Sequence, residues 1–150
     1  NIIVNAGSNG IFCDERYTPG EGFKFVNNTI INPKMDGIRL YAELVPMNAI
    51  VNNIIANPGT YASYSGSRIT DDYFLYLVSP DVNVVMDNNL FVRTEAEIQF
   101  VDATKDNYRL KPGSPAINFG RDISKYQIEE DFYQAERLKG TAYDVGASEF

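Results

Sequence analysis

The chain has 150 residues with 13 Lys and Arg against 20 Asp and Glu, a formal net charge of −7, and contains no His, no Trp and one Cys. This length fits a single domain, the acidic balance argues against a nucleic-acid partner, and no apolar stretch is long enough for a membrane span. The absence of His excludes Ser-His-Asp and Cys-His catalysis, and a lone Cys13 cannot form an intrachain disulfide or join a zinc cluster.

A short segment that begins with Asn recurs along the first two thirds of the chain. It occupies residues 1–5, 28–32, 53–57 and, more loosely, 89–93. A second repeated feature, a pair of residues nine positions after the first Asn of each segment, reads Gly10-Ile11, Gly37-Ile38 and Ala62-Ser63. A repeat of about 25 residues with two anchors at one offset predicts a stack of similar structural units.

The apolar runs between these repeated features are short, rich in β-branched and aromatic residues, and alternate with period two, as in residues 23–26 and 83–86. Such runs predict strands, so the chain is expected to be all-β, as a β-solenoid rather than a β-sandwich with Asn-rich turns. Asn repeated once per coil predicts an internal ladder of Asn1, Asn28 and Asn53, with Ile30 and Ile55 in the core.

The pattern is interrupted at about residues 58–80, a Tyr-, Ser- and Gly-rich insertion that forms either a stacking platform or its own small core. Residues 1–105 are therefore interpreted as the coils and residues 106–150 as a C-terminal cap of the same domain. Residues 122–139 fit a weak amphipathic helix or a packed loop. Two prolines, Pro112 and Pro115, end the repeat because they cannot lie in a central ladder.

The tail carries a family resemblance. Residues 107–118 read NYRLKPGSPAIN and residues 143–150 read YDVGASEF. With the Asn and Gly-Ile repeats, they resemble the C-terminal coils and end cap of the pectin-lyase-like superfamily, departing slightly from the family pattern at 118–120 and 147–149. The resemblance implies a right-handed parallel β-helix of few coils plus a capping segment. It also implies an exported protein, whether secreted, periplasmic or at the cell surface, that acts on or binds polysaccharide.

Aligning the coils by their repeated Asn and Gly-Ile positions predicts which side chains of successive coils stack on one another in a column. Ile11, Cys13, Ile38 and Leu40 are expected to point inward. Three columns are expected to point outward: Phe12 with Arg39 and Tyr64, Asp14 with Tyr41, and Arg16 with Glu43 and Arg68. Arg39 would lie between two rings, and Glu43 between two arginines.

Seven members of these outward columns are the candidate substrate-binding residues, and no catalytic residue is assigned: Asp14, Arg16, Arg39, Tyr41, Glu43, Tyr64 and Arg68. Tyr41 and Tyr64 would stack on sugar rings while Arg39 pairs with a uronate carboxylate. A uronate lyase would also need a base, for which Arg39, Tyr41 and Lys24 are the available types. The alternatives are a non-catalytic glycan-binding or structural β-helix, and an ordinary solvated charge ladder. No cofactor is evident, although Asp14, Glu15 and Glu43 carry the oxygen ligands that calcium prefers.

The two ends of the stack carry separate expectations. Tyr108, Leu110 and Ile117 should pack the last coil, and residues 144–146 should return along it as a final strand that closes the apolar end. The chain begins with Asn1 and reads as a trimmed product. Its first coil is expected either to dimerise or to continue missing N-terminal coils of a longer β-helix.

Overall fold

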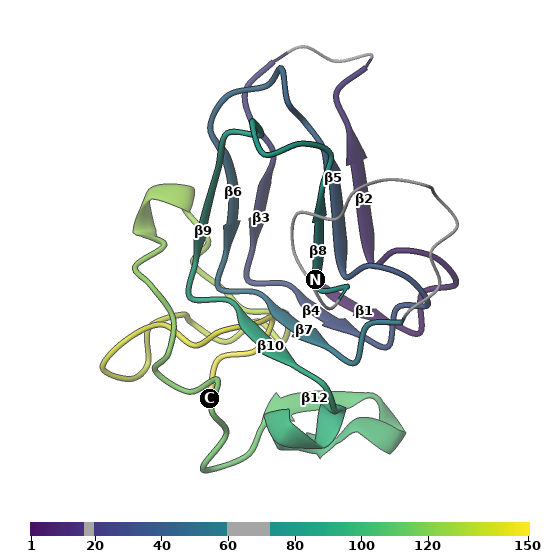
Figure 1. Ribbon diagram of the computed structural model, residues 1–150. Coiled ribbons are helices and arrows are strands. Elements are labelled where there is room, and N and C mark those ends of the chain that lie inside the picture. The colour runs from purple at the N-terminus through teal and green to yellow at the C-terminus, as the bar shows by residue number, and fades with distance from the viewer. Residues whose placement is uncertain (17–19, 60–72) are drawn as a thin grey trace.

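The computed structural model describes residues 1–16, 20–59 and 73–150, and its regular structure is mainly strand (Figure 1). The chain makes three successive passes through the same three positions. The strands are β1 Ile2–Val4, β2 Ile11–Asp14, β3 Lys24–Val26, β4 Thr29–Ile31, β5 Ile38–Tyr41, β6 Asn48–Val51, β7 Ile54–Ala56, β8 Leu75–Leu77, β9 Val84–Asp87 and β10 Leu90–Val92. No helix in the described part of the chain has the length and apolar character needed to cross a bilayer.

Each pass adds one strand to each of three parallel sheets, ordered β1-β4-β7-β10, β2-β5-β8 and β3-β6-β9. The repeated segments pair directly, so that Ile3, Ile30, Ile55 and Phe91 share one column. This arrangement confirms the all-β class and is compatible with a β-helix. β8 lies inside the predicted 58–80 insertion, so the third pass resumes before residue 80.

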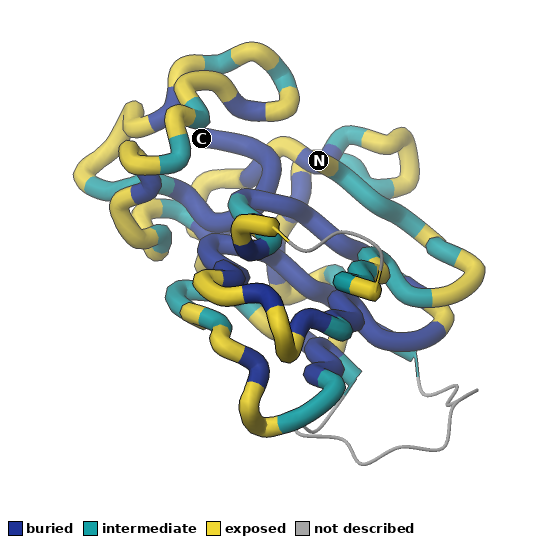
Figure 2. The backbone as a smooth tube through the Cα atoms, turned by 90° about the horizontal axis from the view of Figure 1, so that it is seen from above, coloured by how far each residue is buried: buried dark blue, intermediate teal, exposed yellow. Residues whose placement is uncertain are grey.

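The core lies in the interior that the three sheets surround. Ile30, Ile38, Leu40, Ile50 and Ile55 are fully buried there. The half-buried side chains of the first pass, Ile11 and Cys13 among them, pack against these residues, as the column assignment predicted. Figure 2 shows that the buried residues gather in the stacked strands. The inward faces of the strands therefore make one apolar core.

The predicted asparagine ladder is present and runs through all the passes. Asn1 Nδ2 donates to Asn28 Oδ1 at 2.9 Å, Asn28 Nδ2 donates to Asn53 Oδ1 at 2.9 Å, and Asn53 Nδ2 donates to Asn89 Oδ1 at 2.9 Å. Asn28 and Asn53 are buried. The amides satisfy one another and nearby backbone groups where the chain turns from one sheet into the next.

A second set of asparagines precedes this ladder and holds the C-terminal segment. Asn27, Asn52 and Asn88 have φ of 51°, 55° and 45°, the left-handed backbone that Asn tolerates. Asn27 Nδ2 donates to the carbonyl oxygens of residues 144 and 146, each at 2.9 Å. Asn52 Nδ2 donates to the carbonyl of residue 121, and Asn88 Nδ2 to that of residue 119. One Asn from each pass thus binds residues 119–146.

The C-terminal third has few regular elements: η1 Glu95–Ile98, β11 Phe100–Asp102, η2 Ala103–Lys105, β12 Asn107–Leu110 and η3 Ser124–Tyr126. β11 and β12 form an antiparallel pair. Tyr108 and Leu110 are buried, and Ile117 packs against the same cluster, as predicted. The only helix in residues 122–139 is the short η3, and Glu130 and Glu136 form an isolated antiparallel bridge, which supports the packed-loop reading over the amphipathic helix.

The C-terminal segment does not close the stack as predicted. Residues 144–146 form no strand, and Val145 packs against Ile31 and Ile54, which face away from the core shared by Ile30 and Ile55. Ile123 likewise packs on the outer face of the β3-β6-β9 sheet. At the last strand of its sheet, Phe91 stays 38% exposed. The segment therefore covers the outer faces of two sheets instead of the axial end.

The opposite edge of the stack consists of β1, β2 and β3. Ile3 and Ile11 are half-buried there and pack against the core. The dimerisation or continuation expected at this edge stays a prediction.

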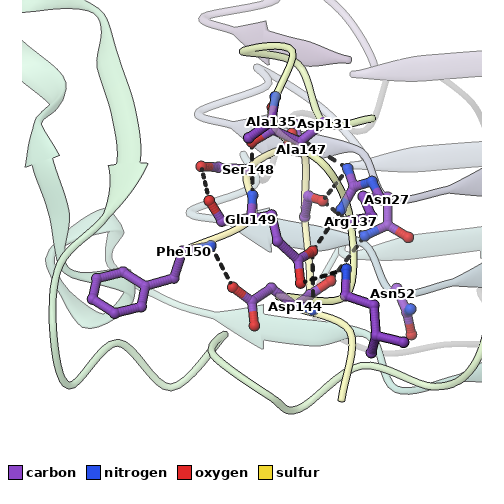
Figure 3. A network of polar contacts seen from close by, with 12 residues as sticks. Asn27, Asn52, Asp131, Ala135, Arg137, Asp144, Ala147, Ser148, Glu149 and Phe150 are labelled. Atoms are coloured by element: carbon purple, nitrogen blue, oxygen red, sulfur yellow. Dashed lines mark hydrogen bonds and ion pairs between the residues drawn. The ribbon is translucent and has the colours of Figure 1, made fainter. Parts of the chain in front are cut away.

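A buried polar network fixes the end of the C-terminal segment (Figure 3). Arg137 Nη1 lies 3.3 Å from Glu149 Oε2, and the two side chains are 3% and 1% exposed. Asp131 accepts backbone N–H bonds from residues 133, 135 and 149, and Asp144 accepts them from residues 118 and 150. Burial raises the pKa of Glu149 and lowers that of Arg137, so removal from water disfavours both charges.

Gly146 lets this segment approach the sheet, so Gly146→Ala should destabilise the chain. Its φ is +93°, and an added Cβ would lie 2.5 Å from Ile54 Cδ1 and 2.7 Å from Thr29 Oγ1. Strain and overpacking together predict a loss of about 2–4 kcal/mol in urea unfolding. The matched control is Gly7→Ala, where nothing lies within 4 Å of the added Cβ. Equal stability of the two variants would contradict the close approach at Gly146.

Candidate functional site

The outer face of the β2-β5-β8 sheet carries a small open pocket of about 270 Å³, named here the β5 pocket. It is lined by Phe12, Asp14, Arg16, Arg39 and Tyr41. Strand alternation places these side chains outward, because their neighbours Ile11, Cys13, Ile38 and Leu40 pack into the core. Four of the seven predicted substrate-binding residues, Asp14, Arg16, Arg39 and Tyr41, therefore meet at one place.

Aromatic rings run across this face along the direction of stacking. The ring centroids of Phe12 and Tyr41 are 5.8 Å apart, and those of Tyr41 and Tyr76 are 5.7 Å apart. Phe12 is 52% exposed, Tyr41 is half-buried and Tyr76 is buried. Two rings of this row therefore offer apolar surface to a ligand, while Tyr76 serves as support.

Arg39 was expected to point outward between two rings and to be available to a uronate carboxylate; it lies against two rings, but its burial was not predicted. It is only 2% exposed, and its Nη1 lies 3.1 Å from Oδ2 of the fully buried Asp36. Its Nη2 donates to the Tyr41 hydroxyl at 3.0 Å, and its Cζ lies 4.0 Å from the Tyr76 ring centroid. A buried guanidinium needs such partners, so Arg39 is engaged within the protein and fixes the Tyr41 side chain.

Asp14 and Arg16 form the polar rim of the pocket. Asp14 Oδ2 lies 2.6 Å from Arg16 Nε, and Asp14 Oδ1 accepts the Arg16 backbone N–H at 2.8 Å. The Asp14 side chain is 13% exposed and the Arg16 side chain is 69% exposed. The pair thus presents hydrogen-bonding groups beside Phe12 and Tyr41 without a net charge of its own.

The predicted ladder of Arg16, Glu43 and Arg68 is not seen among the described residues. Arg16 pairs with Asp14, and Glu43 is exposed beyond the end of β5. Glu15, which was considered with Asp14 and Glu43 for calcium, accepts the backbone N–H groups of residues 44 and 45. In the described ranges no group of three His, Cys, Asp or Glu side chains is placed to hold a metal ion.

Two candidates, Tyr64 and Arg68, lie outside the described residues, as does Ala62-Ser63. The position that the alignment gave to Ala62-Ser63 is taken by Phe74-Leu75, because Ile38 pairs with Leu75. Tyr76 consequently occupies the position beside Arg39 that was assigned to Tyr64. The tyrosines of the insertion were considered as a group, but nothing in the sequence singled out Tyr76.

Three residues of the site were not among the sequence candidates. Phe12 shares the outward column of Arg39 and could have been listed on that ground. Asp36 comes directly before the Gly37-Ile38 anchor, yet its position outside β5 gave no sign that it would reach Arg39. Tyr76 was hidden by the misplaced third repeat.

No family model matches the chain, and no curated protein and no solved structure shows significant similarity to it.

Proposed function

We propose that the protein binds polysaccharide through the β5 pocket. The observation that carries this proposal is the pair of accessible rings, Phe12 and Tyr41, beside the hydrogen-bonding Asp14 and Arg16. A sugar ring has apolar C–H faces and a polar edge of hydroxyls. An aromatic surface next to paired donors and acceptors matches both features.

The Tyr41 ring is preorganised, because its neighbours hold it in one orientation in the absence of a ligand. Its hydroxyl accepts from Arg39, and its ring contacts those of Phe12 and Tyr76. Asp36 in turn holds Arg39. Preorganisation of this kind lowers the entropy that a ligand must lose on binding.

Binding without catalysis accounts for these residues better than a uronate lyase. A lyase must neutralise a carboxylate and supply a base to a carbon-bound proton. Arg39, the residue expected to do the first, is buried against Asp36, and the Lys24 ammonium lies on the backbone carbonyls of residues 22 and 47. The pocket therefore resembles a binding surface more than a catalytic one.

The proposal extends to the fold and location. The three stacked passes and the tail at residues 107–118 support a right-handed parallel β-helix of the pectin-lyase-like kind. Members of that group that meet polysaccharide are exported, so we place this chain outside the cytoplasm.

Phe12→Ala and Tyr41→Ala should each lower glycan affinity about tenfold, because each removes one stacking surface worth about 1–1.5 kcal/mol. Isothermal titration against a panel of oligosaccharides measures this. The matched control is Phe132→Ala, an exposed ring on the C-terminal segment. If only Phe132→Ala lowered the affinity, the binding site would lie on the C-terminal segment and not in the β5 pocket. Ultraviolet absorbance from an unsaturated product would show a lyase instead.

A further inference from the structure

We infer that the β5 pocket selects neutral sugars over uronic acids. This inference rests on the proposed glycan-binding function and specifies its ligand class. Its basis is the charge arrangement on this face: among the described residues, each arginine there is already matched by an aspartate, Arg16 by Asp14 and Arg39 by Asp36.

The outer pair, Asp14 and Arg16, determines the electrostatic interaction of a charged ligand with the rim of the pocket. The Nε–Oδ2 distance of 2.6 Å is that of a close, charge-assisted hydrogen bond. A uronate that approached Arg16 would also approach the Asp14 carboxylate, and the repulsion would offset the attraction. A sugar hydroxyl meets no such opposition, because it can donate to Asp14 and accept from Arg16.

The inner pair, Asp36 and Arg39, cannot be turned toward a ligand at low cost. Its side chains are 0% and 2% exposed, and the guanidinium also contacts Tyr41 and Tyr76. Transfer of Arg39 from Asp36 to a ligand carboxylate would break a buried ion pair. Such a change is strongly disfavoured, so Arg39 keeps its internal partner when a ligand binds.

The charge of the whole chain acts in the same direction. A net charge of −7 produces a negative potential around the molecule, which slows the approach of polyanions and leaves neutral chains unaffected. Recognition of an acidic polysaccharide would need a local positive surface to overcome this potential. The described part of the β5 pocket has balanced charges instead.

The test compares oligosaccharides that differ only at carbon 6, as hydroxymethyl or carboxylate: oligomers of glucose, galactose and mannose against their uronic acids of equal length. Affinities are measured by titration at low and at moderate NaCl. We expect every pair with detectable binding to favour the neutral member. We also expect neutral binding to be insensitive to salt, since no net charge is neutralised.

Asp14→Asn supplies the charge test. The amide oxygen can still accept the Arg16 backbone N–H, so the local turn is kept while the rim gains one positive charge. Affinity for the uronic-acid member should then rise about threefold at low salt, with the neutral member unchanged. Arg16→Gln should act in the opposite sense and weaken uronate binding further.

The outcomes separate the two proposals. Tighter, salt-sensitive binding of the uronic acids by the wild-type protein, lost in Phe12→Ala, would overturn the neutral preference and leave glycan binding at this pocket intact. Absence of binding to every glycan tested would overturn glycan binding, and the preference with it. Preference for neutral sugars that is lost in Phe12→Ala supports both.

Discussion

Arg137→Met should lower the free energy of unfolding by about 3–5 kcal/mol, because it leaves Glu149 buried and charged without its partner. The Arg137 guanidinium lies 3.3 Å from the Glu149 carboxylate and also donates to the carbonyls of residues 146 and 147. Urea unfolding followed by circular dichroism measures the loss. The control is Lys139→Met, an exposed cation two residues away, with an expected change within about 0.5 kcal/mol.

A double variant separates the cost of an unpaired charge from the loss of the pair itself. Arg137→Met with Glu149→Gln removes both charges, while the amide oxygen keeps an acceptor for the backbone N–H of residue 138. We expect the double variant to be about 1–3 kcal/mol more stable than Arg137→Met alone. A double variant no more stable than the single one would show that packing, and not charge, dominates at this site.

The pH dependence gives a second check on the same pair. Burial is the main cause that raises the pKa of Glu149 in the folded chain, followed by repulsion from Asp144. A carboxyl with a raised folded pKa stabilises the folded state at pH below its unfolded pKa, and this contribution is lost as pH rises through the folded pKa. The stability of the wild type relative to the double variant should therefore fall as the pH rises above about 4, the ordinary pKa of a Glu side chain. A rise over that range would contradict the raised pKa.

The repeat could be predicted from the sequence because it depends on local rules. Asn tolerates the left-handed corner and also forms amide ladders, and strand alternation fixes which neighbours face the core. These rules placed Asn28 and Asn53 in the ladder and Ile38 and Leu40 inside. They also gathered four side chains of the β5 pocket on one face.

Contacts that lie outside the strand pattern were not predictable by the same rules. The insertion after β7 shifted the third repeat, and Tyr76 takes the position beside Arg39 that was assigned to Tyr64. The burial of Arg39 depends on Asp36, which lies outside the strand pattern. The C-terminal segment docks through Asn27 on apolar outer faces, whereas a strand-like ending suggested closure of the stack. Each error concerns a contact that the strand pattern of the repeat does not specify.

The asparagine ladder should be the most sensitive part of the repeat to substitution, and Asn53→Ala should lower the free energy of unfolding by about 3–5 kcal/mol. Asn53 is fully buried. Its Oδ1 accepts from the backbone and side chain of Asn28, and its Nδ2 donates to the carbonyls of residues 25 and 51 and to Asn89. Removal of the amide leaves several of these buried groups without partners, each at a cost of about 1–3 kcal/mol.

Asn1→Ala and Asn53→Asp supply the comparison within the same column. Asn1 is exposed and its side chain donates one bond, to Asn28, so its loss should cost less than about 1 kcal/mol. Asp keeps the shape of Asn53 but places a second acceptor against the carbonyl of Phe25 and against Asn89 Oδ1, so Asn53→Asp should destabilise at least as much as Asn53→Ala. A stable Asn53→Asp variant would mean that shape, and not hydrogen bonding, holds the passes in register.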